Sequence, residues 1–217
     1  FSNFTNKQNN YIKMIKNKYS FNEIKNYFDK LSKVKVLLVG ETIIDEYVFC
    51  ETLGKSGKEP VLVLKNIKKE KYPGGGVAIA KHLSDFVKSI FFISIIGQKE
   101  EYKKYILDSL PSNCKYYFLK KNNSPTILKS RFVEIVNKNK LLGIYNLNDD
   151  QINKKTELEF LKVFNKKKTD ANLLLVSDFG HGFITKNIAK KISASNKFTA
   201  LNAQINSSNL GYNSIEK

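Results

Sequence analysis

The pattern of hydrophobic and polar positions differs between segments of this chain, and its first distinct feature is a short apolar run. Val36–Val39 is apolar at every position, and Gly40 ends the run before Ile43, Ile44 and Asp45. An unbroken run of this length predicts a strand buried on both faces, as in parallel sheets. Ligands of open α/β sheets lie beyond the carboxyl ends of such strands, so Asp45 is a candidate binding residue at the lip of a crevice. An aspartate that caps a turn is the equally weighted alternative.

A different pattern follows residue 47, where short strand-like runs are separated by turn residues. These runs are Val61–Leu64, Tyr116–Leu119, Thr126–Val136 and Leu141–Leu147. They predict antiparallel strands, the last two joined as a hairpin across residues 137–140. We therefore expect a small β-sheet lid formed by residues 47–65 and 115–147.

Helical periodicity fills most of the remaining chain. The predicted helices cover residues 77–86, 100–110, 156–168 and 185–195, and predicted strands cover residues 173–177 and 198–201. Residues 1–32 are polar and rich in Lys and Asn, and they predict a linker and then an amphipathic helix after Ser20 that packs beside the first strand. The fold class expected is α/β, with a parallel sheet flanked by helices and a small antiparallel lid.

The net charge of +17 at first indicates a nucleic-acid-binding protein. All but one of the 37 basic residues are lysines, Arg131 being the exception, and they are spread along the chain. Without an arginine-rich patch or a basic stripe interleaved with aromatic residues, we expect no nucleic-acid partner, and DNA binding is a distant third function. The charge favours small anionic substrates.

The spacing of the cysteines and the lengths of the apolar runs indicate the cellular compartment of the protein. Cys50 and Cys114 fit no metal-binding or redox spacing and are interpreted as buried thiols in a reducing compartment. The run Ile90–Ile96 is too short to span a bilayer, and no signal peptide is visible, so we expect a cytoplasmic protein without a membrane partner.

Three further stretches are candidates for chemistry. Pro73-Gly74-Gly75-Gly76 directly precedes a helical pattern, where a ligand can approach the backbone; the alternative is a flexible loop. Asp178 follows a predicted strand within a glycine-rich loop, and the neighbouring His181 is interpreted as a loop histidine without a chemical role. Lys129 and Arg131 leave the same face of a strand, which suits a phosphate or carboxylate as well as it suits a solvated surface.

Five of these segments together resemble the PfkB, or ribokinase-like, carbohydrate kinases. The segments are VLLVGETIIDEYVF, GKSGKEPVLVL, YPGGGVAIAKHL, PTILKSRFV and LLLVSDFGHG, in the order and spacing of that family. Each segment alone is a weak signal, whereas the ordered set is specific. The likeness is greatest to the kinase half of bifunctional heptose-phosphate kinase/nucleotidyltransferase proteins. Residues 33–217 would then be the N-terminal portion of a ribokinase-like domain.

The resemblance implies ATP- and Mg²⁺-dependent phosphoryl transfer to a sugar or sugar-phosphate hydroxyl. It places Asp45 where the family grips the sugar and Gly74-Gly75 where its di-glycine contacts substrate. It matches Asp178 to a strand-end aspartate and Lys129 and Arg131 to a Lys-x-Arg strand of the heptose-phosphate branch. By analogy it also implies a homodimer through the lid and a fused nucleotidyltransferase domain.

This chain also departs from the family pattern. Ala78 stands where relatives often carry Asn, and Asn202-Ala203-Gln204 stands where many carry Asp-Pro-Lys. The late Asn-x-x-Glu and Gly-Ala-Gly-Asp motifs, the second of which carries the catalytic base, have no counterpart before Lys217. We therefore expect residues 1–217 alone to bind sugar phosphate weakly without turning over ATP. The alternative function is a non-catalytic module that binds sugar phosphate or scaffolds a nucleotidyltransferase.

Overall fold

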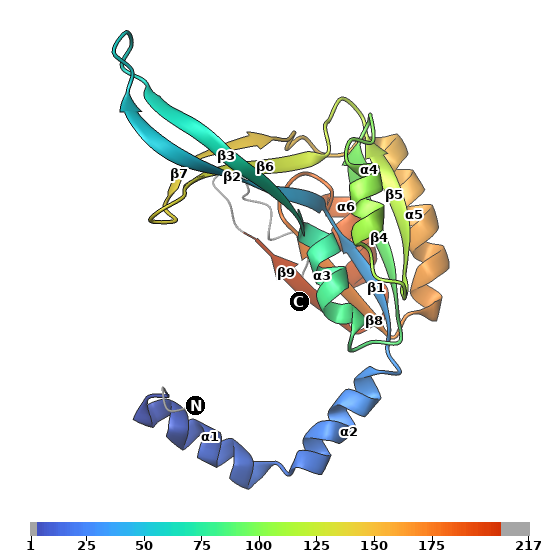
Figure 1. The fold of residues 1–217 in the computed structure, drawn as a ribbon. Coiled ribbons are helices and arrows are strands. Elements are labelled where there is room, and N and C mark those ends of the chain that lie inside the picture. The colour runs from blue at the N-terminus through green and yellow to red at the C-terminus, as the bar shows by residue number, and fades with distance from the viewer. Residues whose placement is uncertain (1–3, 205–217) are drawn as a thin grey trace.

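The computed structural model describes residues 4–204 and contains two sheets of different construction (Figure 1). The larger has five strands in the order β5-β4-β1-β8-β9, and every neighbouring pair is parallel. Its strands are β1 (Lys35–Gly40), β4 (Ser89–Gly97), β5 (Cys114–Lys121), β8 (Leu173–Asp178) and β9 (Thr199–Ala203). The predicted buried runs thus form the centre of a parallel sheet, which confirms the α/β fold class.

Helices cover both faces of this sheet because successive strand residues point to opposite sides. Leu37 and Val39 of β1 share one core with α5 (Lys154–Lys167) and α6 (Lys186–Ser193). Val36 and Leu38 share a second core with α3 (Gly75–Ser84) and α4 (Lys103–Ser109). The four predicted helices are therefore confirmed, and the sheet is buried on both faces.

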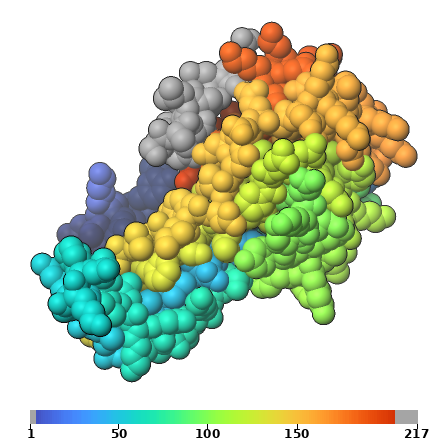
Figure 2. Space-filling view, turned by 90° about the horizontal axis from the view of Figure 1, so that it is seen from above, coloured from blue at the N-terminus to red at the C-terminus, as the bar shows by residue number. Residues whose placement is uncertain are grey.

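The smaller sheet is the lid, in the order β3-β2-β6-β7, and it extends away from the body (Figure 1), as Figure 2 also shows from above. Its strands are β2 (Thr42–Lys55), β3 (Leu62–Gly74), β6 (Ile127–Glu134) and β7 (Lys140–Asn146). The expectation of a purely antiparallel lid is wrong: β2 pairs antiparallel with β3 but parallel with β6. The chain crosses the body between β3 and β6, so β6 enters the lid in the same direction as β2. The predicted hairpin of β6 and β7 is confirmed.

The run Tyr116–Leu119 was predicted as an antiparallel lid strand, and this is also wrong. It lies in β5, which pairs parallel with β4 at the edge of the larger sheet. Several β5 side chains are exposed, so the strand has the mixed pattern of a lid strand. The first lid hairpin, in turn, reaches Gly74 rather than ending near residue 65.

The N-terminal region forms two helices rather than a linker and one helix. These are α1 (Asn6–Lys18) and α2 (Phe21–Leu31), each begun by a capping box, from Thr5 and Ser20 respectively. Neither helix contains a buried residue, and α1 lies apart from the body (Figure 1). The predicted packing beside the first strand is therefore wrong; the ring contact of Phe28 with Phe86, at 5.9 Å between centroids, joins α2 to the body.

None of the helices in the described part of the chain combines the length and hydrophobicity that a membrane crossing requires.

Candidate functional site

Asp45 occupies a strand position rather than a turn. It lies within β2 beside Lys129 of β6, and Tyr47 of β2 lies beside Arg131. Because side chains alternate across a sheet, these four side chains leave the same face of the lid. The turn-capping alternative is wrong, and the predicted shared face of Lys129 and Arg131 also carries the candidate carboxylate.

The Arg131 guanidinium donates a hydrogen bond to the Asp45 carboxylate, and the two groups form an ion pair. Both side chains are about a quarter exposed or less, at 21% and 26%, so water screens the pair only in part. Although burial alone lowers the pKa of Arg131, its hydrogen bond to Asp45 leaves that pKa above the ordinary value. Asp45 thus holds a permanent cation beside it.

Aromatic rings line the same face of the lid. The Arg131 guanidinium carbon lies 5.7 Å from the ring centroid of Tyr47 and 5.9 Å from that of Tyr145. The Lys129 ammonium lies 5.7 Å from the Tyr145 ring. Next to them is a hollow of about 420 Å³, lined by Asp45, Tyr47, Phe49 and Tyr72. A hollow of this size, with carboxylate and ring surfaces and with Arg131 paired to its carboxylate, suits a small polar ligand with an anionic group.

The glycine segment brings the backbone against Asp45. Gly74 ends β3, and a Cβ atom built on it would lie 2.3 Å from Asp45 Oδ2. Gly75 has a φ of +55°, and a Cβ there would lie 2.4 Å from the carbonyl oxygen of Glu41. No side chain fits either space. Asp45 and Glu41 of the protein itself approach the backbone at Gly74 and Gly75, and contact of these glycines with a ligand stays a prediction.

Asp178 belongs to a second cluster, at the carboxyl ends of β1 and β8. Its side chain is buried, its Oδ1 accepts a hydrogen bond of 2.9 Å from the Gly180 N–H, and burial raises its pKa. The neighbouring carboxylate is Glu41, which directly follows β1 and is fully buried. Asp178 therefore lies at the predicted sheet edge, in contact with the body rather than with the lid.

Glu41 is the residue that sequence reasoning missed. Its carboxylate accepts hydrogen bonds from the backbone N–H groups of Phe179, at 2.9 Å, and His181, at 3.3 Å. Its carbonyl oxygen accepts a 2.8 Å bond from the Gly76 N–H at the start of α3. Burial, and then the charge of Asp178, raise the pKa of Glu41 to about 7. One buried residue thus joins the Asp178 loop to the glycine segment.

His181 is a buried histidine of the Asp178 loop, and its lack of a chemical role stays a prediction. The ring is buried at 3% exposure, and Nδ1 lies 2.7 Å from Asp149 Oδ1. Its carbonyl oxygen accepts a 2.9 Å hydrogen bond from the Lys121 ammonium, and burial lowers the pKa of the ring. His181 therefore ties the Asp178 loop to the chain segment that follows β7.

Lys129 is a cation that interacts with carboxylates of both the lid face around Asp45 and the sheet edge around Glu41. Burial lowers its pKa, whereas the negative charges of Asp45, Asp149 and Glu41 act in the opposite direction. Lys129 is accordingly placed between the lid carboxylate and the carboxylates near the sheet edge. The arrangement can hold a ligand that presents hydroxyl groups to Asp45 and an anionic group to Lys129 and Arg131.

Within residues 4–204 no group of three or more His, Cys, Asp and Glu side chains is placed to hold a metal ion. Mg²⁺ usually takes one or two carboxylates and completes its shell with phosphate oxygens and water. The described residues thus do not form a self-sufficient Mg²⁺ site.

Comparison with known proteins confirms the resemblance seen in the sequence. No family model matches the chain. Over 160 residues, or 74% of its length, it is 27% identical to the Bifunctional protein HldE of Campylobacter jejuni subsp. doylei and 26% identical to that of Nitratiruptor sp.. The chain spans about a third of the length of these curated relatives (33% and 34%).

Solved structures show the same fold. The phosphofructokinase-2 of Escherichia coli, determined with fructose-6-phosphate, matches with a TM-score of 0.56 at 13% identity, over 81% of this chain and 56% of that one. A carbohydrate kinase of Agrobacterium tumefaciens matches with a TM-score of 0.54 at 16% identity, over 77% of this chain and 53% of that one. The fold is therefore ribokinase-like.

Proposed function

We propose that this chain is the sugar-binding part of an ATP-dependent carbohydrate kinase of the PfkB type, with a sugar phosphate of the heptose 7-phosphate class as acceptor. The observation that carries the proposal is the lid face on which Asp45, Lys129 and Arg131 converge beside Gly74. The likeness to HldE proteins and the ribokinase-like fold support it.

The Asp45–Arg131 pair favours a phosphorylated acceptor over a neutral sugar. Sugar hydroxyls that donate to Asp45 compete with the Arg131 guanidinium for the same carboxylate. Arg131 then needs another anion, because a partly buried guanidinium without a partner is costly. A phosphate group on the sugar satisfies Arg131 by bidentate hydrogen bonds and Lys129 as a point charge.

In a kinase, these residues would hold the acceptor while the donor phosphate approaches. Phosphoryl transfer depends on positioning and electrostatic stabilisation, so a fixed sugar hydroxyl is the contribution expected from Asp45 and the glycine segment. ATP would supply the transferred γ-phosphoryl group. ATP and Mg²⁺ as cofactors, a fused nucleotidyltransferase, a homodimer through the lid and a cytoplasmic location remain predictions.

Substitution of Asp45 tests the proposal. Asp45→Asn keeps the size of the side chain but removes its charge, and Asp45→Ala removes the hydroxyl acceptor altogether. We expect Asp45→Ala to weaken heptose 7-phosphate binding by about 1–3 kcal/mol, the usual cost of leaving buried polar groups unpaired. Asp45→Asn should have a smaller effect. Isothermal titration calorimetry measures both.

Glu51→Ala is the matched control, because Glu51 lies on the same strand but is exposed and pairs with Lys65. It should leave the affinity unchanged. Equal affinity of the parent and Asp45→Ala proteins would show that Asp45 does not grip the sugar.

A further inference from the structure

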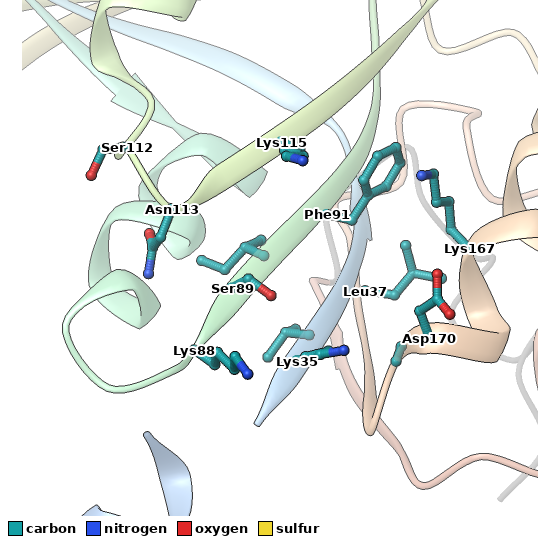
Figure 3. A pocket seen from close by; sticks show the side chains of 13 residues that line it. Lys35, Leu37, Lys88, Ser89, Phe91, Ser112, Asn113, Lys115, Lys167 and Asp170 are labelled. Carbon is teal, nitrogen blue, oxygen red and sulfur yellow. The ribbon is translucent and has the colours of Figure 1, made fainter. Parts of the chain in front are cut away.

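A separate cavity lies at the end of the parallel sheet opposite Asp178, where the strands begin (Figure 3). It has a volume of about 340 Å³ and lies between the first residues of β1 and β4, the segment before β5, and the end of α5. Its apolar lining includes Leu37, Ile90 and Phe91. The volume is within the range of small-molecule sites in proteins.

Lysines dominate the charged lining of this cavity. Lys35, Lys88, Lys115 and Lys167 face one carboxylate, that of Asp170. Among residues 4–204, no carboxylate lies within 4.0 Å of any of these four ammonium groups. Such a concentration of unpaired cations around a concave, partly apolar surface attracts anions.

The lysines come from different elements, so the fold and not one flexible segment gathers them. Figure 3 shows Lys35 of β1, Lys115 of β5 and Lys167 of α5 around Ser89 and Phe91. The Lys167 ammonium lies 4.4 Å from the ring centroid of Phe91, a cation–π contact that holds it over the apolar lining. Charge and ring surface are thus presented together.

Asn113 is a fixed part of the wall of this cavity. Its Nδ2 donates to the carbonyl oxygens of Ser84, at 3.0 Å, and Val87, at 3.2 Å, which fixes the orientation of the amide. Its Oδ1 is buried and accepts no hydrogen bond from any described residue. Because this oxygen has almost no accessible surface, Asn113 shapes the wall of the cavity and does not offer Oδ1 to a ligand.

We propose that this cavity is a binding site for a phosphorylated small molecule with a ring, of the size and chemistry of a nucleoside monophosphate. The lysines bind its phosphate, and the partly exposed ring of Phe91 packs against its ring. The site is at the opposite end of β1 from Glu41 and does not depend on the proposed sugar kinase function.

Titration of the chain with adenosine 5′-monophosphate, adenosine and inorganic phosphate tests the proposal. We expect the nucleotide to bind at least tenfold more tightly than either part alone, and its affinity to fall as salt rises from 50 to 300 mM. In ¹H–¹⁵N spectra the Asn113 side-chain amide should shift with the nucleotide. Equal binding of adenosine or of phosphate, or no binding of the nucleotide at millimolar concentration, would overturn the proposal.

Reversing the charge of lysines in the cavity tests whether the nucleotide binds there. The double variant Lys115→Glu/Lys167→Glu should bind the nucleotide at least tenfold more weakly. The control Lys81→Glu/Lys162→Glu makes the same change of net charge at two exposed lysines outside the cavity and should retain affinity within about twofold. If loss of the Phe91 contact unfolds the double variant, Lys115→Glu alone replaces it, with Lys81→Glu as control. Equal losses in variant and control would mean that the nucleotide responds only to overall charge.

Discussion

Replacement of Gly75 by valine is expected to abolish sugar-phosphate binding and to destabilise the junction between lid and body. Gly75 has a left-handed backbone, with φ of +55°, which costs other residues about 1–2 kcal/mol. Its Cβ would also lie 2.4 Å from the Glu41 carbonyl oxygen and 3.1 Å from Ile43 Cγ1. Because the oxygen belongs to the backbone, β3 or α3 must move, and the total cost should exceed the strain of the left-handed backbone alone.

Variants of two other glycines distinguish backbone strain from steric clash as causes of the loss at Gly75. Gly54 also has a positive φ, of +102°, but a Cβ there meets nothing within 4 Å, so Gly54→Ala carries backbone strain only. Gly57 has neither a positive φ nor a neighbour within 4 Å, so Gly57→Val should be close to neutral. Urea unfolding ranks the variants and calorimetry measures binding. Parent-like binding by Gly75→Val would mean that the segment is only a connector.

The second large effect concerns Glu41 and is a dependence of stability on pH. The pKa of Glu41 in the folded chain is about 7, against an ordinary value of 4.5, because the carboxylate is buried near Asp178. The folded state therefore holds this proton more tightly than the unfolded chain does. The resulting stability is fully present below about pH 4.5 and is lost as the pH rises through 7, in total about 3 kcal/mol.

Glu41→Gln has no charge to lose and should lack this contribution. Between pH 5 and pH 8, the free energy of unfolding of the parent should fall by about 3 kcal/mol relative to that of the variant. The loss of hydrogen bonds to Phe179 and His181 shifts the two curves by a constant amount, so the difference in slope isolates the titration. Glu51→Gln, at an exposed position, is the control. Parallel curves for parent and Glu41→Gln would show that Glu41 does not titrate in this range.

The core of the fold could be predicted because its signal is local. Val36–Val39 and Leu173–Val176 are apolar at every position, and short runs of this kind bounded by turn residues are typical of strands covered on both faces. β5 carries no such signal: as an edge strand with exposed side chains, it has the same alternation as a lid strand. Which sheet a strand of this kind joins depends on residues far away in the chain, and periodicity contains no information about them.

In the candidate site, too, single residues could be predicted from local sequence, whereas contacts between distant residues could not. Asp45, Lys129 and Arg131 could be selected from the sequence, but the ion pair joins residues 86 positions apart and depends on the register between β2 and β6. Glu41 had a usable signal, since it directly follows a buried strand, the rule that selected Asp178. Asp45 follows in the same stretch as a second carboxylate, so position after the strand does not by itself distinguish the two.

The most direct test of the sugar-phosphate account is the affinity difference between heptose 7-phosphate and unphosphorylated heptose, measured by calorimetry on the parent chain and on Lys129→Gln/Arg131→Gln. The parent should prefer the phosphate by about tenfold or more, or ~1.4 kcal/mol. The double variant should lose that preference, and Lys140→Gln, at an exposed lysine that begins β7, should keep it. Equal affinity of the parent for both sugars, or a preference that survives in the double variant, would contradict the assignment of this lid face to phosphate binding.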